Sequence, residues 1–221
     1  MGAKLRAARD EDLPFLAEVL GMAGRGQLAR GPWDFVFPDS GERQRGLERI
    51  AGGAERSFCH RSVFRVAEHA GVASAGLVAF DASDFDQHAL ARAMFAAFGT
   101  LGFSSGRSAA VAPLLAPYLA CFPDMPAGTW IIENVATRPE ARRRGLVAQL
   151  LEHALEDGRR RGFARAQISV LIGNEPAQRA YEQDGFRVVE TRSTPEFARL
   201  MGAPGFVRMT LALGSAGGGA R

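Results

Sequence analysis

The feature that most constrains this chain is a basic, glycine-containing turn between an expected strand and an expected helix. The turn runs from Arg142 to Val147, after the apolar run 130–136 and at the start of the helix-like run 145–161. The first N–H groups of a helix have no intrahelical partner, and the helix dipole is positive at that end. Gly145 allows close approach of the backbone, and the arginines add charge. The turn therefore predicts a phosphate-binding site.

The turn matches neither of two common nucleotide-binding signatures. It contains no Gly-x-x-x-x-Gly-Lys-Ser/Thr sequence and no Gly-x-Gly-x-x-Gly sequence. Its pattern is Arg-x-x-Gly-x-Val, and it follows the turn Thr137-Arg138-Pro139. Downstream, the segment 174–181 reads Asn-x-x-Ala-x-x-x-Tyr and is followed by Gly185-Phe186.

These two ordered motifs resemble those of the GNAT superfamily of N-acetyltransferases. The pyrophosphate loop of that family reads Gln/Arg-x-x-Gly-x-Gly/Ala. This chain departs from it at Val147, whose amide stays available but whose side chain adds bulk. The resemblance covers both ends of the chain and leaves 21–40 and 81–128 without a counterpart.

The resemblance implies an α/β fold with a mixed, mostly antiparallel sheet flanked by helices. Two central parallel strands would splay to admit a cofactor. We expect a single domain over 1–213 with a helical insertion at 81–128, because that segment carries two apolar helical faces and is too apolar for a linker. The tail 214–221 is expected to be disordered.

Local patterns along the chain predict the individual elements. The expected strands are 4–8, 62–68, 72–80, 130–137, 166–171, 186–191 and 207–213. The first expected helix begins after the Asp10 to Asp12 cap, and the other expected helices cover 42–51, 145–161 and 176–183. The glycine- and proline-rich stretch 21–40 is expected to be a loop with aromatic anchors.

The resemblance also implies a binding site for acetyl-CoA. A bulge in the strand 130–137 would expose backbone groups to the pantetheine arm, and the basic turn would hold the pyrophosphate. Asn174 would meet the pantetheine amide, and Ala177 would leave room for the cofactor. The implied cofactor-binding residues are Val135, Ala136, Thr137, Arg142, Arg143, Arg144, Gly145, Leu146, Val147, Asn174 and Ala177.

Tyr181 is the implied general acid. A phenol is protonated at neutral pH and can donate its proton to a departing thiolate. The context from Asn174 to Ala177 favours this role over that of a core tyrosine on an amphipathic helix.

Glu133 is the candidate general base, by its proximity to the predicted site. The positions at which family members place a catalytic glutamate align here with Ile131 and Ser169, so a structural carboxylate and a water chain both stay open. By period two, 131, 133 and 135 would share a face and Asn134 would point away. Three aspartates would make the pocket negative if 81–128 folds back: Asp81, Asp84 and Asp86.

The resemblance implies acetyl transfer from acetyl-CoA to a primary amine by direct attack. The absence of a cysteine near the motifs favours this direct route over a covalent enzyme intermediate. The alternative is an acyl-CoA-binding regulatory module without turnover. A net charge of +3 suits a polyanionic ligand but discriminates little. Nucleic-acid binding is disfavoured because the basic runs are not interleaved with aromatic residues.

The remaining features bear on location and partners. Cys59 and Cys121 are too few for a disulfide framework, which favours a cytoplasmic protein. No signal peptide or membrane span is recognisable. No metal is expected, because Cys59-His60 lacks a second ligand pair. The expected partner is a small-molecule or peptide amine, with no nucleic acid and no membrane, and a homodimer stays open.

Overall fold

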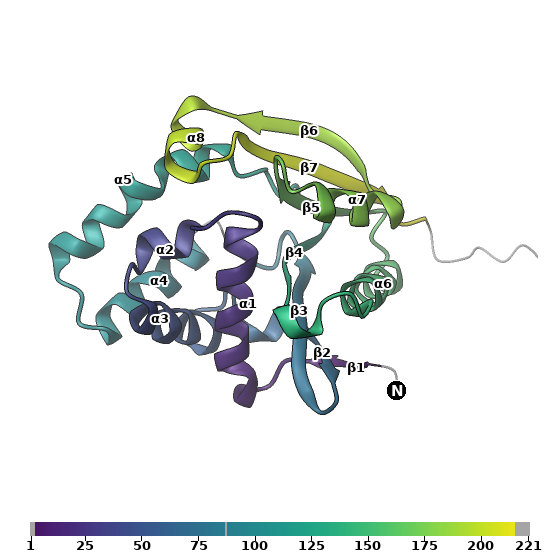
Figure 1. Ribbon diagram of the computed structural model, residues 1–221, viewed down its shortest axis with the longest axis horizontal. Helices are drawn as coiled ribbons and strands as arrows, with labels where there is room; N and C mark the ends of the chain where they lie inside the picture. The colour runs from purple at the N-terminus through teal and green to yellow at the C-terminus, as the bar shows by residue number, and fades with distance from the viewer. Residues whose placement is uncertain (1–2, 87, 215–221) are drawn as a thin grey trace, which may run out of the picture.

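Seven strands form one sheet in the order β1-β2-β3-β4-β5-β7-β6 in the computed structural model, which describes residues 3–86 and 88–214 (Figure 1). Only β4 and β5 run parallel; every other neighbouring pair is antiparallel. The predicted mixed, mostly antiparallel sheet is thus confirmed. The strands are β1 Lys4–Ala7, β2 Phe64–His69, β3 Val72–Asp81, β4 Trp130–Thr137, β5 Arg165–Leu171, β6 Arg187–Ser193 and β7 Gly205–Ala212.

Helices cover both faces of the sheet. They are α1 Leu13–Arg25, α2 Pro32–Val36, α3 Ser40–Gly52, α4 Ala89–Thr100, α5 Ser105–Cys121, α6 Leu146–Arg160, α7 Glu175–Gln183 and α8 Pro195–Met201. The helices α1 to α4 lie on one side of β3 and β4, and α6 lies on the other (Figure 1). Alternate residues of β3 serve these two cores, because side chains along a strand point to opposite faces: Val78 and Phe80 face the α1 side, and Leu77 and Ala79 face the α6 side.

The stretch 21–40, expected to be a loop, contains the end of α1 and the whole of α2. Its glycines serve helix packing as well as turns. A Cβ on Gly24 would lie 3.1 Å from Trp33 Cδ1, so glycine permits α1 to approach that ring closely. Arg25, in the last turn of α1, pairs with Asp34 of α2 at 2.6 Å. Long-range packing therefore overrides the local loop signal.

The segment 81–128 contains α4 and α5. The helix α4 packs along α3, and Phe98 of α4 stacks on Phe103 with ring centroids 4.9 Å apart. The helix α5 contacts α2 at one end of its course and α8 at the other. In Figure 1, α5 runs along the upper left of the molecule, from the group of α2 to α4 up to α8, beside the half of the sheet that holds β5, β6 and β7.

The strands β4 and β5 stay paired for only three residues and then separate. Trp130, Ile131 and Ile132 pair with Ala166, Gln167 and Ile168, and no pairing follows. Just beyond, Asn134 has a φ of 52°, and the register of β4 against β3 shifts between Gly76 and Val78. This bulge turns β4 away from β5, which gives the predicted splay.

The bulge also changes which residues of β4 share a face. Ile131 belongs to the core on the α1 side, whereas Val135 packs against the core on the α6 side. Asn134 does not point away from the site as expected, because its Nδ2 lies 3.9 Å from Cys59 Sγ. The extra residue in the bulge breaks the simple alternation of a strand.

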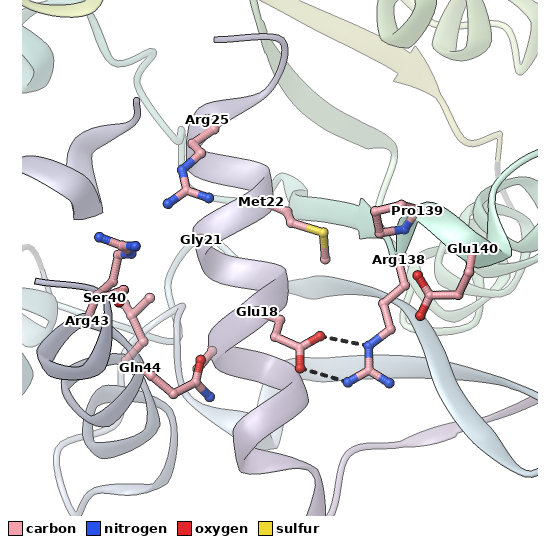
Figure 2. A pocket seen from close by; sticks show the side chains of 12 residues that line it. Glu18, Gly21, Met22, Arg25, Ser40, Arg43, Gln44, Arg138, Pro139 and Glu140 are labelled. Carbon is pink, nitrogen blue, oxygen red and sulfur yellow. Dashed lines mark hydrogen bonds and ion pairs between the residues drawn. The ribbon is translucent and has the colours of Figure 1, made fainter. Parts of the chain in front are cut away.

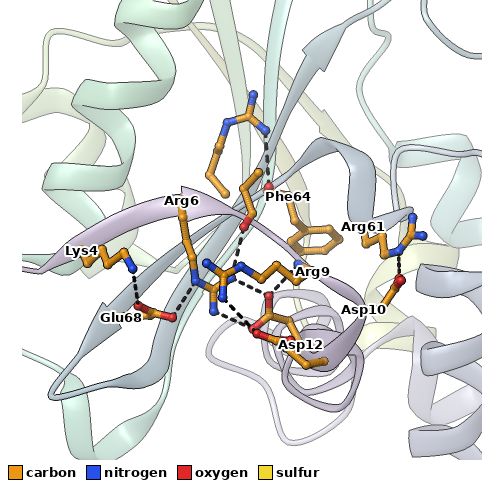
Figure 3. A network of polar contacts seen from close by, with 11 residues as sticks. Lys4, Arg6, Arg9, Asp10, Asp12, Arg61, Phe64 and Glu68 are labelled. Carbon is orange, nitrogen blue, oxygen red and sulfur yellow. Dashed lines mark hydrogen bonds and ion pairs between the residues drawn. The ribbon is translucent and has the colours of Figure 1, made fainter.

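An ion-pair network fixes the first strand to the first helix (Figure 3). Arg6 of β1 donates to both carboxylate oxygens of Asp12, at 2.6 and 2.8 Å, and to Glu68 of β2 at 2.6 Å. Asp12 is buried and also accepts from the Arg9 backbone N–H at 2.7 Å. Burial alone would raise the pKa of Asp12, but the hydrogen bonds from Arg6 and Arg9 hold it below its ordinary value.

We predict that Arg6→Ala lowers the free energy of unfolding by about 3 kcal/mol, because it leaves a buried carboxylate unpaired. The matched control is Arg9→Ala, which removes an exposed pair with Glu11 and a minor attraction to Asp12 but keeps the backbone N–H bond to Asp12; it should cost less than about 1 kcal/mol. Because the pKa of Asp12 is lowered on folding, its stabilisation is present at neutral pH and is lost as the pH falls below 3.8. Urea titrations would measure both effects; equal losses in the two variants would contradict this role.

Candidate active site

A large cavity of about 1250 Å³ lies where β4 and β5 separate. It reaches from the start of α6, past the bulge in β4, to the helices α4 and α5. The structure brings all of the predicted site residues to its walls. They are Glu133, Val135, Ala136, Thr137, Arg142, Arg143, Arg144, Gly145, Leu146, Val147, Asn174, Ala177 and Tyr181.

The basic turn closes one end of the cavity and leads into α6. Gly145 is the N-cap residue of α6 with a φ of 71°, and the first backbone hydrogen bond of the helix runs from Gln149 N–H to Gly145 O at 3.2 Å. The N–H groups of 146–148 therefore have no intrahelical partner. A Cβ on Gly145 would meet no atom within 4 Å, so this position needs glycine for its left-handed backbone.

The three arginines of the turn keep their charges available. Arg142, Arg143 and Arg144 are exposed, and within the described ranges none of them forms an ion pair. The single side-chain hydrogen bond here joins Arg142 Nε to Thr137 O at 3.5 Å. Three free cations at a positive helix end favour a multiply charged anion.

A smaller hollow of about 330 Å³ is lined by residues of α1 and α3 and by Arg138 (Figure 2). Its cations are all engaged. Arg138 donates to both oxygens of Glu18 at 2.7 and 2.8 Å, and Arg25 and Arg43 both pair with Asp34. This hollow therefore offers no free charge to an anion. The Arg138–Glu18 pair instead ties the end of β4 to α1, just before the basic turn.

Glu133 lines the large cavity and comes directly before the bulge in β4. Its side chain is nine-tenths buried, and its Oε1 has no hydrogen-bond partner in the part of the chain that the structure describes. Burial raises the pKa of this carboxyl to about 8, although neighbouring Ser169 favours the charged form. A carboxyl with that pKa can take up or release a proton near neutral pH.

Both tyrosines of the chain lie close to Glu133. Tyr181 of α7 is 6% exposed, and burial, together with the charge of Glu133, raises the pKa of its phenol. Tyr118 of α5 shows the same two influences on its pKa, burial first and then Glu133. Sequence reasoning missed Tyr118 because no motif surrounds it; only the packing of α5 brings it to the cavity.

Asn174 has a structural bond as well as a place in the cavity. It is the N-cap residue of α7, and its Oδ1 accepts from Ala177 N–H at 3.4 Å. This bond fixes the start of α7 and, about two turns later, the position of Tyr181. Any ligand contact of Asn174 therefore falls to its remaining amide group or its backbone.

The wall formed by the segment 81–128 is apolar, which corrects the expected acidic pocket. None of Asp81, Asp84 and Asp86 lines the cavity. Asp86 is exposed and pairs with Arg92 at 2.7 Å. These three aspartates lie at the start of the segment, outside the cavity, whereas α4 and α5 present their apolar faces to it.

Among residues 3–86 and 88–214, no three His, Cys, Asp or Glu side chains gather where they could bind a metal ion. The helices described in the same ranges include none with the length and apolar character needed to traverse a bilayer.

Comparisons with known proteins agree with the fold and the turn. The model of the acetyltransferase (GNAT) family matches residues 115–186, which hold β4, the basic turn, α6, β5 and α7. A curated relative, GCN5-related N-acetyltransferase 6, chloroplastic, of Arabidopsis thaliana, is 35% identical over 60 residues. That match covers 27% of this chain and 21% of the relative, so it spans about a fifth of the relative's length.

Solved structures share the fold over nearly the whole chain. An N-acetyltransferase from Staphylococcus aureus Mu50 has a TM-score of 0.68 at 17% identity and covers 95% of this chain and 100% of its own. The yncA protein from Salmonella typhimurium, solved with its cofactor acetyl-CoA, has a TM-score of 0.54 at 16% identity, covering 100% and 99%. These structures show the shared fold, and the family-model match over 115–186 confirms the resemblance to the GNAT superfamily.

We predict that Glu133 makes the protein less stable as the pH rises. Its pKa is raised on folding from 4.5 to about 8, so the stabilisation is present below pH 4.5 and is lost as the pH rises through about 8. Glu133→Gln lacks this titration and should gain stability relative to the wild type between about pH 5 and about pH 9. Urea unfolding at both pH values measures the difference; an unchanged difference would contradict a buried, protonated Glu133.

Proposed function

We propose that this chain, whose residues 115–186 belong to the acetyltransferase (GNAT) family, transfers an acetyl group from acetyl-CoA to a primary amine. One observation carries the proposal: the basic turn at the start of α6, with its free N–H groups and arginines, and the buried, unpartnered carboxyl of Glu133 line one continuous cavity. The first feature suits a phosphate-bearing cofactor, and the second suits proton removal from a nucleophile.

The residues around the basic turn fit CoA. The N–H groups of 146–148 and the free arginines would hold the pyrophosphate. Beyond Ile132 no strand pairs with β4 on the β5 side, so backbone groups of Val135 to Thr137 can bond to the pantetheine arm. The similar Salmonella typhimurium protein was solved with acetyl-CoA, which supports this choice of cofactor.

Two side chains would move the protons of the reaction. The cosubstrate supplies the thioester, whose carbonyl carbon the amine nitrogen attacks, forming the C–N bond as the C–S bond breaks. Glu133, in its ionised form, accepts the proton that the amine loses. Tyr181 donates its phenolic proton to the departing sulfur, because its raised pKa keeps the phenol protonated at neutral pH.

The transfer would proceed directly, without an acetylated enzyme. Cys59 is the cysteine that lines the cavity, but its side chain is fully buried, and burial raises the pKa of its thiol. A thiol held in its protonated form is a poor nucleophile. An amine acceptor agrees with the N-acetyltransferase names of the Arabidopsis thaliana and Staphylococcus aureus relatives.

Release of free CoA thiol on adding primary amines, with the acetylated product identified by mass spectrometry, tests this function. A regulatory module would bind acetyl-CoA by calorimetry and release no thiol with any amine. That result would reject the transferase and keep the cofactor site.

We predict that Tyr181→Phe lowers kcat by about 10²–10⁴-fold, the usual effect of losing a general acid. The affinity for acetyl-CoA should change little, because the substitution removes a single hydroxyl group. Steady-state kinetics and calorimetry on the same preparation provide the measurement and its control. A kcat within a factor of about two of the wild type would show that another group protonates the sulfur.

A further inference from the structure

We propose that the acceptor is a primary amine with an apolar alkyl or aromatic body, bound in a compartment that α4 and α5 build beside Glu133. This inference rests on the proposed transferase function and names the substrate class of that site. The compartment is the part of the large cavity that lies away from the basic turn. Its walls include Phe58, Met94, Phe98, Val111, Leu115 and Tyr118.

The position of this compartment separates it from the cofactor end. The basic turn and α7 hold one end of the cavity, on the α6 side of the sheet, whereas α4 and α5 lie with α1 to α3 on the other side (Figure 1). Glu133 lies near both ends, because its charge acts on Tyr181 of α7 and on Tyr118 of α5. An amine nitrogen at Glu133 would therefore extend its body toward α4 and α5.

The charges of the cavity favour one amine and no second cation. Apart from the three arginines of the turn, Glu133 is the single charged residue among the described residues that line it. The unpartnered Oε1 of Glu133 can accept a hydrogen bond from one ammonium or amine group. A second ammonium or a guanidinium farther in would be buried without a partner, which is costly.

The apolar character continues to the rim. Phe95 of α4 and Leu119 of α5 line the cavity while 57% and 59% exposed, respectively. Large apolar side chains that stay exposed around an opening indicate a surface that binds an apolar ligand. The walls formed by α4 and α5 and the rim of the opening are thus all apolar. A polyamine or a basic peptide would instead require an acidic lining.

A homologous series of n-alkylamines, from propylamine to heptylamine, tests this inference. If each added methylene is buried, kcat/KM should rise about fourfold per carbon, which corresponds to ~0.8 kcal/mol per buried CH₂. A matched pair isolates the charge: n-hexylamine and its isostere cadaverine differ in a terminal methyl or ammonium group. Hexylamine should be preferred at least about tenfold.

A variant pair tests the wall itself. Leu115 is buried in the wall, and its neighbour on α5, Leu114, is 39% exposed and does not line the cavity. Leu115→Glu should lower kcat/KM for hexylamine at least about tenfold and narrow or reverse its advantage over cadaverine. Leu114→Glu should leave both values unchanged. If Leu115→Glu does not fold, Leu115→Ala should still flatten the alkylamine series, with acetyl-CoA affinity and melting temperature as controls.

Binding is measured separately, by calorimetric titration of the CoA-saturated protein with the same alkylamines. A rising series in binding without turnover would support the apolar compartment and reject the transferase function. A rising series in both would support both. A flat series, a preference for cadaverine or a lysine peptide, or no binding of any alkylamine to the CoA-saturated protein would overturn the inference.

Discussion

The separation of β4 from β5 is the constraint on which the site depends. Pairing stops at Ile132, and Asn134 then takes a left-handed conformation that bends β4 toward β3. A continuous ladder would satisfy the backbone groups of both strands and fill the space between them. Because the ladder stops, backbone groups become available to a ligand, and Glu133 is left at the edge of a cavity. The bulge thus both opens the cavity and places the Glu133 carboxyl at its edge.

Glu133 joins two environments of opposite chemistry. On one side lie free arginines and unpaired helix N–H groups; on the other lie the apolar faces of α4 and α5. The carboxyl is too buried to ionise at its ordinary pKa and has no partner at Oε1. Above its raised pKa, an unpaired buried carboxyl contributes nothing favourable to folding. Its burial is therefore better explained by a role in binding a substrate or transferring a proton.

The parts that local sequence signals specify could be predicted. Gly145 and Asn174 sit at helix starts where their backbone and capping roles are set by nearby residues, and both were placed from motifs. Contacts made over long range could not be predicted. Gly24 packs against Trp33 inside a supposed loop, and Tyr118 reaches the region of Glu133 only because α5 bridges α2 and α8. The single extra residue of the bulge likewise reversed the face assigned to Val135.

Acetyl-CoA binding to a pair of glycine variants at the two ends of α6 tests the account most directly. Gly145 and Gly162 have φ angles of 71° and 82°, and a Cβ at either position would meet no atom within 4 Å, so Glu substitutions strain both sites alike. Calorimetry should show at least about tenfold weaker binding for Gly145→Glu, ~1.4 kcal/mol, and unchanged binding for Gly162→Glu. Equal affinities in the two folded variants would contradict a cofactor held at the start of α6.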